Sequence, residues 1–306
     1  MKIRPTFSAP ILMMIVLALK VSVQYVDFLS VGLTADPYLT YGLVLMIVFA
    51  LPCVIYCRIC GREYVRRLRL RPFKIDLIIL LLTAALAMEL GSLALNLFAA
   101  KIADNPNTVL EKIVPFSVPG APKVSEVIVF CLLPAVVEEF LFRAILCADY
   151  ENVSAPWAVL IGALFFGSFQ LNIEHFLSAF YCGMILAMTL YATRSLIAPI
   201  LVHMIHNIAG YFGRDYMLRA SNITGGRGIM LLLVVFALMF LCLGVFVWEW
   251  QGAYTMYAQT GVRAEYARRN RPASVPRSYL IQALVAPPFI VYWLLLLAYA
   301  VWRILL

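Results

Sequence analysis

The chain has 306 residues, 64% of which are apolar, and its mean hydropathy is +0.92. Globular domains are apolar over roughly half of their residues, so this composition excludes a chain dominated by a water-soluble domain and indicates an integral membrane protein. The formal net charge is +8. The basic residues gather in loops beside apolar runs, which is typical of membrane topology signals and excludes nucleic acid as the expected partner.

Apolar runs long enough to cross ~30 Å of hydrocarbon recur along almost the whole chain. We expect nine transmembrane helices, with eight as the alternative, because the runs between 153 and 213 are almost without loops and leave room for a re-entrant helix. The predicted fold class is all-α, a polytopic transmembrane helical bundle of about eight to nine spans. The expected spans are 8–32, 39–57, 75–100, 124–148, 153–173, 175–193, 195–213, 228–250 and 279–302.

The first apolar run is longer than the core of a secretory signal peptide and contains Lys20, Gln24 and Asp27. We therefore interpret it as a retained span whose polar side chains face the bundle. Basic residues fill two loops, 58–74 and 263–277, and the positive-inside rule predicts that both lie in the cytosol. The N-terminus is then also cytosolic, and the protein is predicted to be a multi-pass protein of the cell membrane. Anionic lipid head groups are the expected partners of both loops.

The segments between the spans carry few other signals. Residues 101–123 are predicted to form a polar connector with a short amphipathic piece near 107–114, and residues 251–278 a long cytosolic loop with an interfacial helix. The seven cysteines lie within or beside spans, where thiols stay reduced, so we predict no disulfide framework. Cys57 and Cys60 have metal-type spacing, but a structural zinc site needs a second pair, which the sequence lacks.

Three charged residues interrupt the predicted fourth span, within the sequence VEEFLFR. Glu139 and Arg143 are four residues apart in the favoured acid-before-base order, so they are expected to form an ion pair on one helix face. Glu138 lies ~100° around the helix from Glu139 and has no cation close in sequence. It therefore needs a partner from another span, and it suits a base that takes a proton from water.

His203 and Asn207, in the predicted seventh span, are also four residues apart and offer an imidazole and an amide to one cavity. This pair is similar to an oxyanion hole. If the two spans run in opposite directions, Glu138 and His203 lie about ten and eight residues from their cytosolic ends, so their depths agree within a few Å. A base, two polarising donors and a wet pocket predict water attack on a carbonyl, in the form of peptide-bond hydrolysis.

The two motifs resemble those of a known family. Glu138-Glu139 followed by Arg143 is similar to the EExxxR motif of type II CAAX prenyl endopeptidases and bacteriocin-immunity-type (CPBP) intramembrane proteases. His203 followed by Asn207 is similar to the HxxxN motif of the same family. The resemblance implies that Glu138 activates water, that Glu139 with Arg143 supports it, and that His203 with Asn207 stabilises the oxyanion.

The resemblance covers roughly residues 124–213 and implies a glutamate-dependent endopeptidase that cuts a membrane-associated peptide or protein near the cytosolic side. No obligatory cofactor is expected. A zinc-dependent protease is the alternative, with His203, His206 and Glu138 as ligands, although the HExxH pattern is absent. The chain then divides into N-terminal transmembrane helices with a basic cytosolic loop, a CAAX-protease-like core, and C-terminal transmembrane helices with a second basic loop, at residues 1–123, 124–213 and 214–306.

One position departs from the family pattern. Between the two motifs the family carries FxxxH, whereas this chain has FGSFQ from Phe166 to Gln170. Gln170 donates and accepts hydrogen bonds but cannot titrate near neutral pH, so it predicts slow or absent catalysis. On a continuous helix His175 would lie about 140° from Gln170 and could not replace the missing imidazole, unless the helix breaks at Asn172.

Two further functions therefore stay open. A catalytically impaired relative would bind a peptide or membrane-protein partner in the same cavity as a scaffold, and Gln170 favours it. A transporter would relay charge through intramembrane acids but requires paired repeats, which the sequence does not show. Glu89 and Asn96 are expected to be hydrogen-bond partners between helices, while His206 is either catalytic or satisfied by a backbone carbonyl or Glu139.

Overall fold

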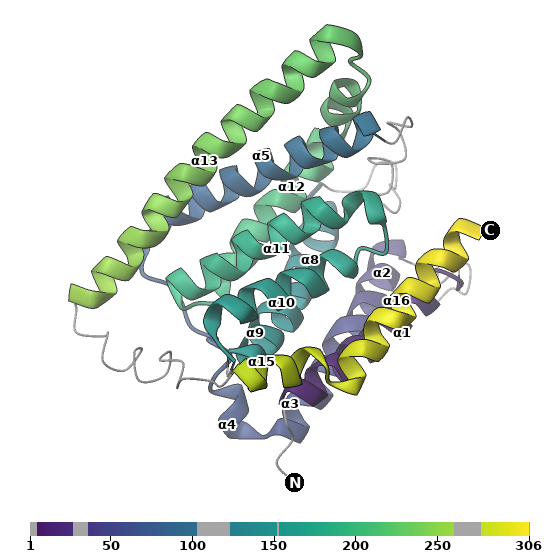
Figure 1. Cartoon of the computed structure of the whole chain (residues 1–306), viewed down its shortest axis with the longest axis vertical. Coiled ribbons are helices and arrows are strands. Elements are labelled where there is room, and N and C mark those ends of the chain that lie inside the picture. The colour runs from purple at the N-terminus through teal and green to yellow at the C-terminus, as the bar shows by residue number, and fades with distance from the viewer. Residues whose placement is uncertain (1–4, 27–35, 103–122, 152, 260–276, 306) are drawn as a thin grey trace.

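The structure, a computed structural model, describes residues 5–26, 36–102, 123–151, 153–259 and 277–305 (Figure 1). Nearly all of these residues are helical, and no strand occurs among them. The predicted fold class is confirmed, because the chain forms a polytopic helical bundle.

Helices follow one another along the chain, interrupted by three π-helical segments and one 3-10 turn. In order they are α1 (Pro5–Val23), α2 (Pro37–Leu45), a π-helical segment (Met46–Ala50), α3 (Leu51–Cys60), α4 (Arg62–Val65), a 3-10 turn (Ile75–Leu77), α5 (Ile78–Ile102), α7 (Lys123–Glu126), a π-helical segment (Val127–Leu132), α8 (Leu133–Glu139), a π-helical segment (Phe140–Leu146), α9 (Cys147–Tyr150), α10 (Ala155–Ser168), α11 (Ile173–Thr193), α12 (Ile197–Ser221), α13 (Gly225–Gln259), α15 (Arg277–Leu284) and α16 (Pro287–Leu305), all within the described residues.

Within the described residues, the apolar helices that could lie in a membrane fall into two length classes. Four are long enough to cross it, namely Pro37–Cys60, Ile75–Ile102, Ile173–Thr193 and Gly225–Met256. Three are apolar but shorter, namely Phe7–Val23, Ala155–Ser168 and Pro287–Trp302. The total of eight to nine spans stays a prediction.

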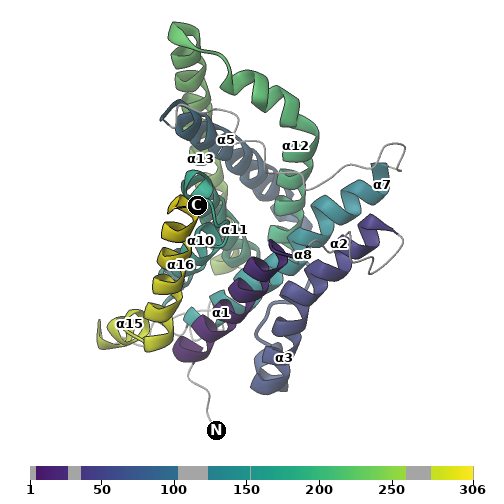
Figure 2. The ribbon, with the colours of Figure 1, turned by 90° about the vertical axis from the view of Figure 1, so that its right-hand side faces the viewer.

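The helices pack as two neighbouring groups around the segment that carries the acidic pair. Helix α13 lies along α5, which also contacts α11 and α12 (Figure 1). On the other side, α1 packs against α16 and α3, and α2 packs against α8 (Figure 2). The segment from α8 to α9 therefore lies between a group built from the N-terminal and C-terminal helices and a group built from α5, α11, α12 and α13.

The acidic pair lies where an α-helix changes into a π-helix. Pro134 is in the first turn of α8, where its missing N–H is tolerated, and it follows the π-helical segment Val127–Leu132. Helix α8 ends at Glu139, and the next π-helical segment begins at Phe140. π-helical turns are uncommon and occur frequently at functional sites.

The predicted span 153–173 is corrected by the structure. Helix α10 ends at Ser168, and Leu171 adopts a left-handed backbone with a φ of 56°. Asn172 then caps α11, because its side chain accepts a hydrogen bond from the backbone N–H of Glu174 at 3.0 Å. Gln170 therefore lies in a turn rather than on a helix face.

The ends of other predicted segments also change. Helix α1 ends at Val23, α12 continues to Ser221, and α13 continues to Gln259, so residues 251–259 are helical and not part of a loop. The predicted amphipathic piece near 107–114 lies outside the described residues, as does most of the predicted interfacial helix. Asp27 lies outside them as well.

The loop between α4 and α5 is packed against the bundle. Arg69 forms an ion pair with Glu151 at 2.7 Å, and its carbonyl oxygen accepts a hydrogen bond from the N–H of Leu196 at 3.0 Å. Arg71 donates to the carbonyl oxygen of Arg194 at 3.1 Å. The basic loop thus covers the end of α9 and the connection between α11 and α12. Its cytosolic placement and its lipid contacts stay predictions.

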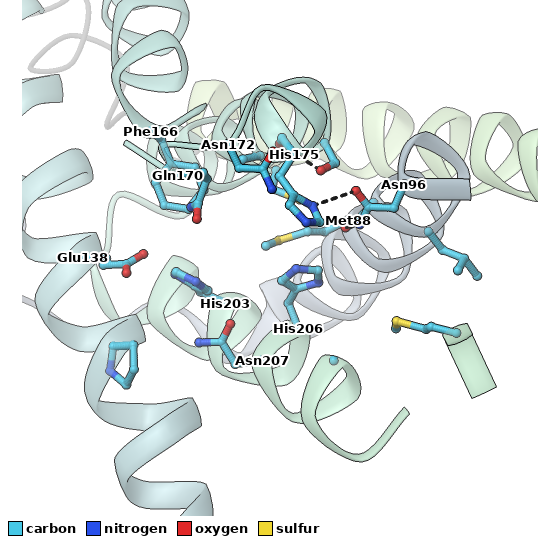
Figure 3. Close-up of a pocket in the computed structure, with 18 of the residues that line it drawn as sticks. Met88, Asn96, Glu138, Phe166, Gln170, Asn172, His175, His203, His206 and Asn207 are labelled. Atoms are coloured by element: carbon cyan, nitrogen blue, oxygen red, sulfur yellow. Dashed lines mark hydrogen bonds between the residues drawn. The ribbon is translucent and has the colours of Figure 1, made fainter. Parts of the chain in front are cut away.

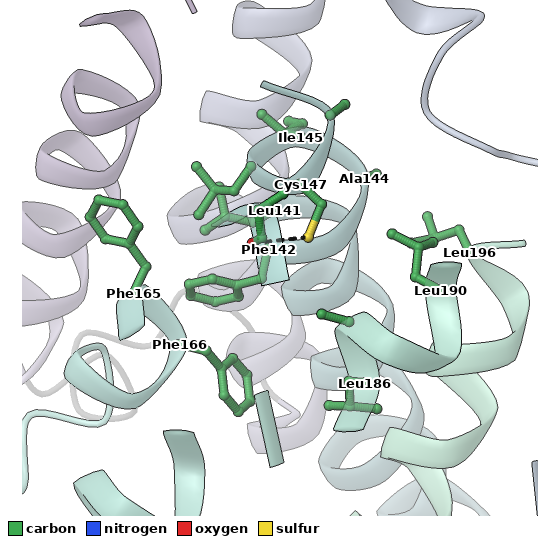
Figure 4. Packing of buried hydrophobic residues seen from close by; sticks show 14 of the residues in the cluster. Leu141, Phe142, Ala144, Ile145, Cys147, Phe165, Phe166, Leu186, Leu190 and Leu196 are labelled. Atoms are coloured by element: carbon green, nitrogen blue, oxygen red, sulfur yellow. Dashed lines mark hydrogen bonds between the residues drawn. The ribbon is translucent and has the colours of Figure 1, made fainter. Parts of the chain in front are cut away.

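A buried aromatic core supports the acidic segment. Phe142 makes edge-to-face contacts with Phe166 and Phe169, with ring centroids 5.1 Å and 5.6 Å apart (Figure 4). Phe165 and Leu186 are fully buried beside them. Aromatic and branched side chains at crystal-like packing density resist displacement, so they fix the helix that carries Glu138 and Glu139.

Helices α10 and α11 approach each other at Gly183. A Cβ atom at this position would lie 2.9 Å from the Cα of Ala163, which is backbone and cannot move easily. We expect Gly183→Ala to lower the free energy of unfolding by about 1–3 kcal/mol through overpacking. The thermal midpoint in one detergent measures this loss.

Gly244 of α13 provides the matched control, because a Cβ there would meet nothing within 4 Å. Gly244→Ala should be neutral or stabilising, since alanine is the better helix former by roughly 0.5–1 kcal/mol. Equal midpoints for the two variants would contradict the close approach of α10 and α11.

Candidate active site

A cavity of about 400 Å³ opens between α8, α12, α5 and the turn that joins α10 to α11. Four of the predicted site residues line it, namely Glu138, Gln170, His203 and Asn207 (Figure 3). The two other predicted residues, Glu139 and Arg143, lie behind its wall and are fully buried. The structure thus brings the two sequence motifs together around one space.

Glu138 points into the cavity from the last turn of α8, toward His203 (Figure 3). The sequence predicted a partner from another span for this carboxylate, and α1 provides Lys20, which lines the same cavity and interacts electrostatically with Glu138. The ammonium group of Lys20 donates to the carbonyl oxygen of Phe169 at 2.7 Å and lies 4.1 Å from the ring centroid of Phe169. These contacts place its charge at the C-terminal end of α10, where the helix dipole favours a cation.

Glu139 is the centre of a buried polar group. Its Oε1 accepts hydrogen bonds from Arg143 Nη1 at 2.7 Å and from His203 Nδ1 at 2.8 Å. The predicted ion pair is present, and it also engages the histidine of the second motif. Arg143 further donates to the carbonyl oxygen of Gly183 at 3.3 Å and lies 4.3 Å from the ring centroid of Phe166. These contacts offset part of the cost of burying the two charges, while Oε2 of Glu139 is buried without a hydrogen-bond partner among the described residues.

The orientation of His203 follows from this contact. Because Nδ1 is bonded to the Glu139 carboxylate, the opposite ring nitrogen, Nε2, is left for the cavity that His203 lines. The edge of the ring packs against Phe166, with centroids 5.8 Å apart. One turn further along α12, Asn207 donates from Nδ2 to the carbonyl oxygen of Cys131 at 3.1 Å. An amide nitrogen carries two protons, so one N–H of Asn207 is left for a ligand.

Gln170 and His175 both line the cavity, as the sequence allowed if the helix breaks at Asn172. The expected separation of 140° assumed a continuous helix, but the chain turns between Ser168 and Ile173. Nδ1 of His175 lies 3.3 Å from Oδ1 of Asn96, so these two residues form a link between α11 and α5. The predicted role of Asn96 as an interhelical partner is confirmed.

One pair at the cavity was not predicted. Nδ1 of His206 lies 2.7 Å from Oε2 of Glu89, and His206 lines the cavity beside His203 (Figure 3). The sequence had offered a backbone carbonyl or Glu139 as the partner of His206, and both are wrong. The signal was an isolated carboxylate in the third apolar run, but sequence spacing alone could not say which span α5 faces.

The donor set does not fit a shared metal ion. Among the residues that the structure describes, no group of three or more His, Cys, Asp or Glu side chains is arranged to hold one. His203 and His206 each direct Nδ1 to a separate carboxylate, Glu139 and Glu89. The zinc-dependent alternative thus finds no support in the placement of these side chains, and a metal-free reaction stays a prediction.

A comparison with protein families identifies the segment that contains the site. Residues 120–209 match the family model described as type II CAAX prenyl endopeptidase, Rce1-like. The match confirms the resemblance predicted from the two motifs and supports a protease, and it includes all six predicted site residues. Lys20 and Glu89 lie outside it. No curated protein and no solved structure matches the chain.

Proposed function

We propose that this chain, with a type II CAAX prenyl endopeptidase segment at its centre, is a glutamate-dependent intramembrane endopeptidase. Its substrate is a membrane-associated peptide or protein, cut near the cytosolic side. The observation that carries the proposal is the arrangement of Glu138, His203 and Asn207, which come from two helices and line one cavity. Together they offer a base and two polarising groups to the same space.

The geometry supports the following reaction. A water molecule in the cavity gives a proton to the Glu138 carboxylate while its oxygen attacks the carbonyl carbon of the scissile peptide. The carbonyl oxygen becomes an oxyanion, which the second N–H of Asn207 and the Nε2–H of a His203 ring protonated on both nitrogens stabilise. Glu139 holds the His203 ring by its Nδ1, and Arg143 balances the charge of Glu139.

The alternative function is that of a binding or scaffold protein without catalysis. Gln170 favours it, because this side chain lines the cavity where the family carries a histidine. The two functions share the cavity and the substrate class but differ in turnover. A measurement of the cleavage product therefore distinguishes the two functions.

Purified protein in proteoliposomes, incubated with a panel of quenched membrane-associated peptides, separates the two functions. The endopeptidase predicts at least one peptide that is cut, with two fragments whose masses add up to substrate plus one water. Binding of peptides without any product would overturn the proposed function and support the scaffold.

Gln170→His tests how much the missing imidazole matters. We expect the wild type to be active and the variant to differ from it by less than about tenfold, because Glu138 supplies the base in both. Initial rates on the same peptide measure the ratio, and Gln170→Ala is the control for loss of the polar side chain alone. A wild type without activity that Gln170→His restores would instead identify a decayed protease.

A further inference from the structure

The pair formed by Glu89 and His206 resembles a catalytic acid-base unit more than a structural link. Nδ1 of His206 lies 2.7 Å from Oε2 of Glu89, and about a quarter of each side chain is accessible, at 24% for both. The buried pair of Glu139 and His203, by comparison, is accessible to 0% and 6%. A carboxylate that holds one ring nitrogen fixes the ring and aims the other nitrogen at whatever occupies the space beside it.

One proton transfer of the proposed reaction is still to be assigned, either to the protonated Glu138 or to a second acid. When the tetrahedral intermediate collapses, the C–N bond breaks and the leaving nitrogen must take up a proton, because an amide anion is too poor a leaving group. In this chain Glu138 takes the proton of the attacking water. Gln170 cannot supply another, since an amide does not titrate near neutral pH.

Among the described residues, four basic side chains line the cavity, and three of them are engaged elsewhere. Lys20 donates to the carbonyl oxygen of Phe169 and interacts electrostatically with Glu138, the base. The Nε2 atom of His175 is buried, so it does not reach a substrate. His203 is held by Glu139 and faces the developing oxyanion. His206 is the fourth, one helix turn from His203 and on the side of it away from Glu138 (Figure 3).

We propose that His206 is the general acid that protonates the leaving amine, and that Glu89 positions the His206 ring. This inference rests on the proposed function. The Nε2–H bond of the imidazolium breaks, its electron pair stays on the ring, and the proton forms an N–H bond on the leaving nitrogen as the C–N bond breaks. The imidazole regains a proton from Glu138 through water, which closes the cycle. The net change is peptide plus water to acid plus amine.

A pair of substrates with the same acyl peptide tests this role. One carries the scissile amide, and the other a nitrophenyl ester, whose leaving group departs without prior protonation. His206→Gln should lower kcat for the amide by ~10²–10⁴-fold, the usual effect of losing a general acid, and kcat for the ester by less than about tenfold. Glu89→Gln should show the same pattern as His206→Gln, with a larger loss on the amide than on the ester, but both losses should be smaller because the imidazole itself remains.

The controls separate this inference from the proposed function. His175→Gln makes the same chemical change in the same cavity and should affect both substrates alike. An equal loss on amide and ester in His206→Gln, with the wild type active on both, overturns the role of His206 and leaves the endopeptidase in place. A wild type that cuts neither substrate overturns both. Thermal midpoints of all variants show that the enzyme compared is folded.

Discussion

Glu138→Gln is expected to lower kcat for peptide hydrolysis by ~10²–10⁴-fold, because the variant keeps the shape of the side chain but cannot accept a proton from water. The effect should be equal on amide and ester substrates, since both need an activated water. KM should change little, because the cavity and its other lining groups stay in place. Initial rates with purified protein in proteoliposomes measure both constants.

Glu249→Gln is the matched control for this variant. Glu249 is another carboxylate within an apolar helix, α13, but it does not line the cavity. Its replacement should leave kcat unchanged. A Glu138→Gln variant that retains the wild-type rate would remove the base from the proposed reaction.

Arg143→Met is expected to lower the free energy of unfolding by about 3–5 kcal/mol, because it leaves the Glu139 carboxylate buried without its arginine. The two side chains are accessible to 1% and 0%, and their contact is 2.7 Å long. His203 retains its bond to Glu139, so the protein should still fold at low temperature. Thermal or denaturant unfolding in one detergent gives the difference.

Two controls show whether burial causes this loss. Arg66 and Glu63 form an ion pair of the same length, 2.7 Å, with accessibilities of 75% and 84%, so Arg66→Met should cost less than about 1 kcal/mol. The double variant Glu139→Gln and Arg143→Met should recover part of the loss, because no unpaired charge then remains at this pair. A loss in Arg143→Met no larger than in Arg66→Met would contradict the buried pair.

Much of the fold and of the site followed from the sequence because membranes impose strict rules. Runs of apolar residues had to be helices, and each charged residue within them needed a partner. Spacing by four then placed Glu139 beside Arg143, and His203 beside Asn207, on the basis of helix geometry alone. Glu138 and His203 were expected at the same depth in two helices that run in opposite directions, so we expected the two helices to share a cavity.

The contacts that sequence could not supply are those between helices that lie far apart in the chain. Glu89 meets His206, and Lys20 reaches the cavity, through the way in which α5 and α1 pack and rotate, which hydropathy does not encode. The end of α10 was missed for a local reason. Gln170 and Asn172 were interpreted as polar positions on a helix, whereas the Asn172 side chain caps the next helix.

Thiol labelling of Gln170→Cys shows whether these side chains surround water inside the bundle. A small water-soluble methanethiosulfonate reagent is added to the variant in proteoliposomes, and the modified peptides are identified by mass spectrometry. Cys147, which is fully buried in the aromatic core, is the control within the same molecule. We expect rapid modification at position 170 and none at Cys147, whereas a position 170 as unreactive as Cys147 would show that no water reaches these side chains.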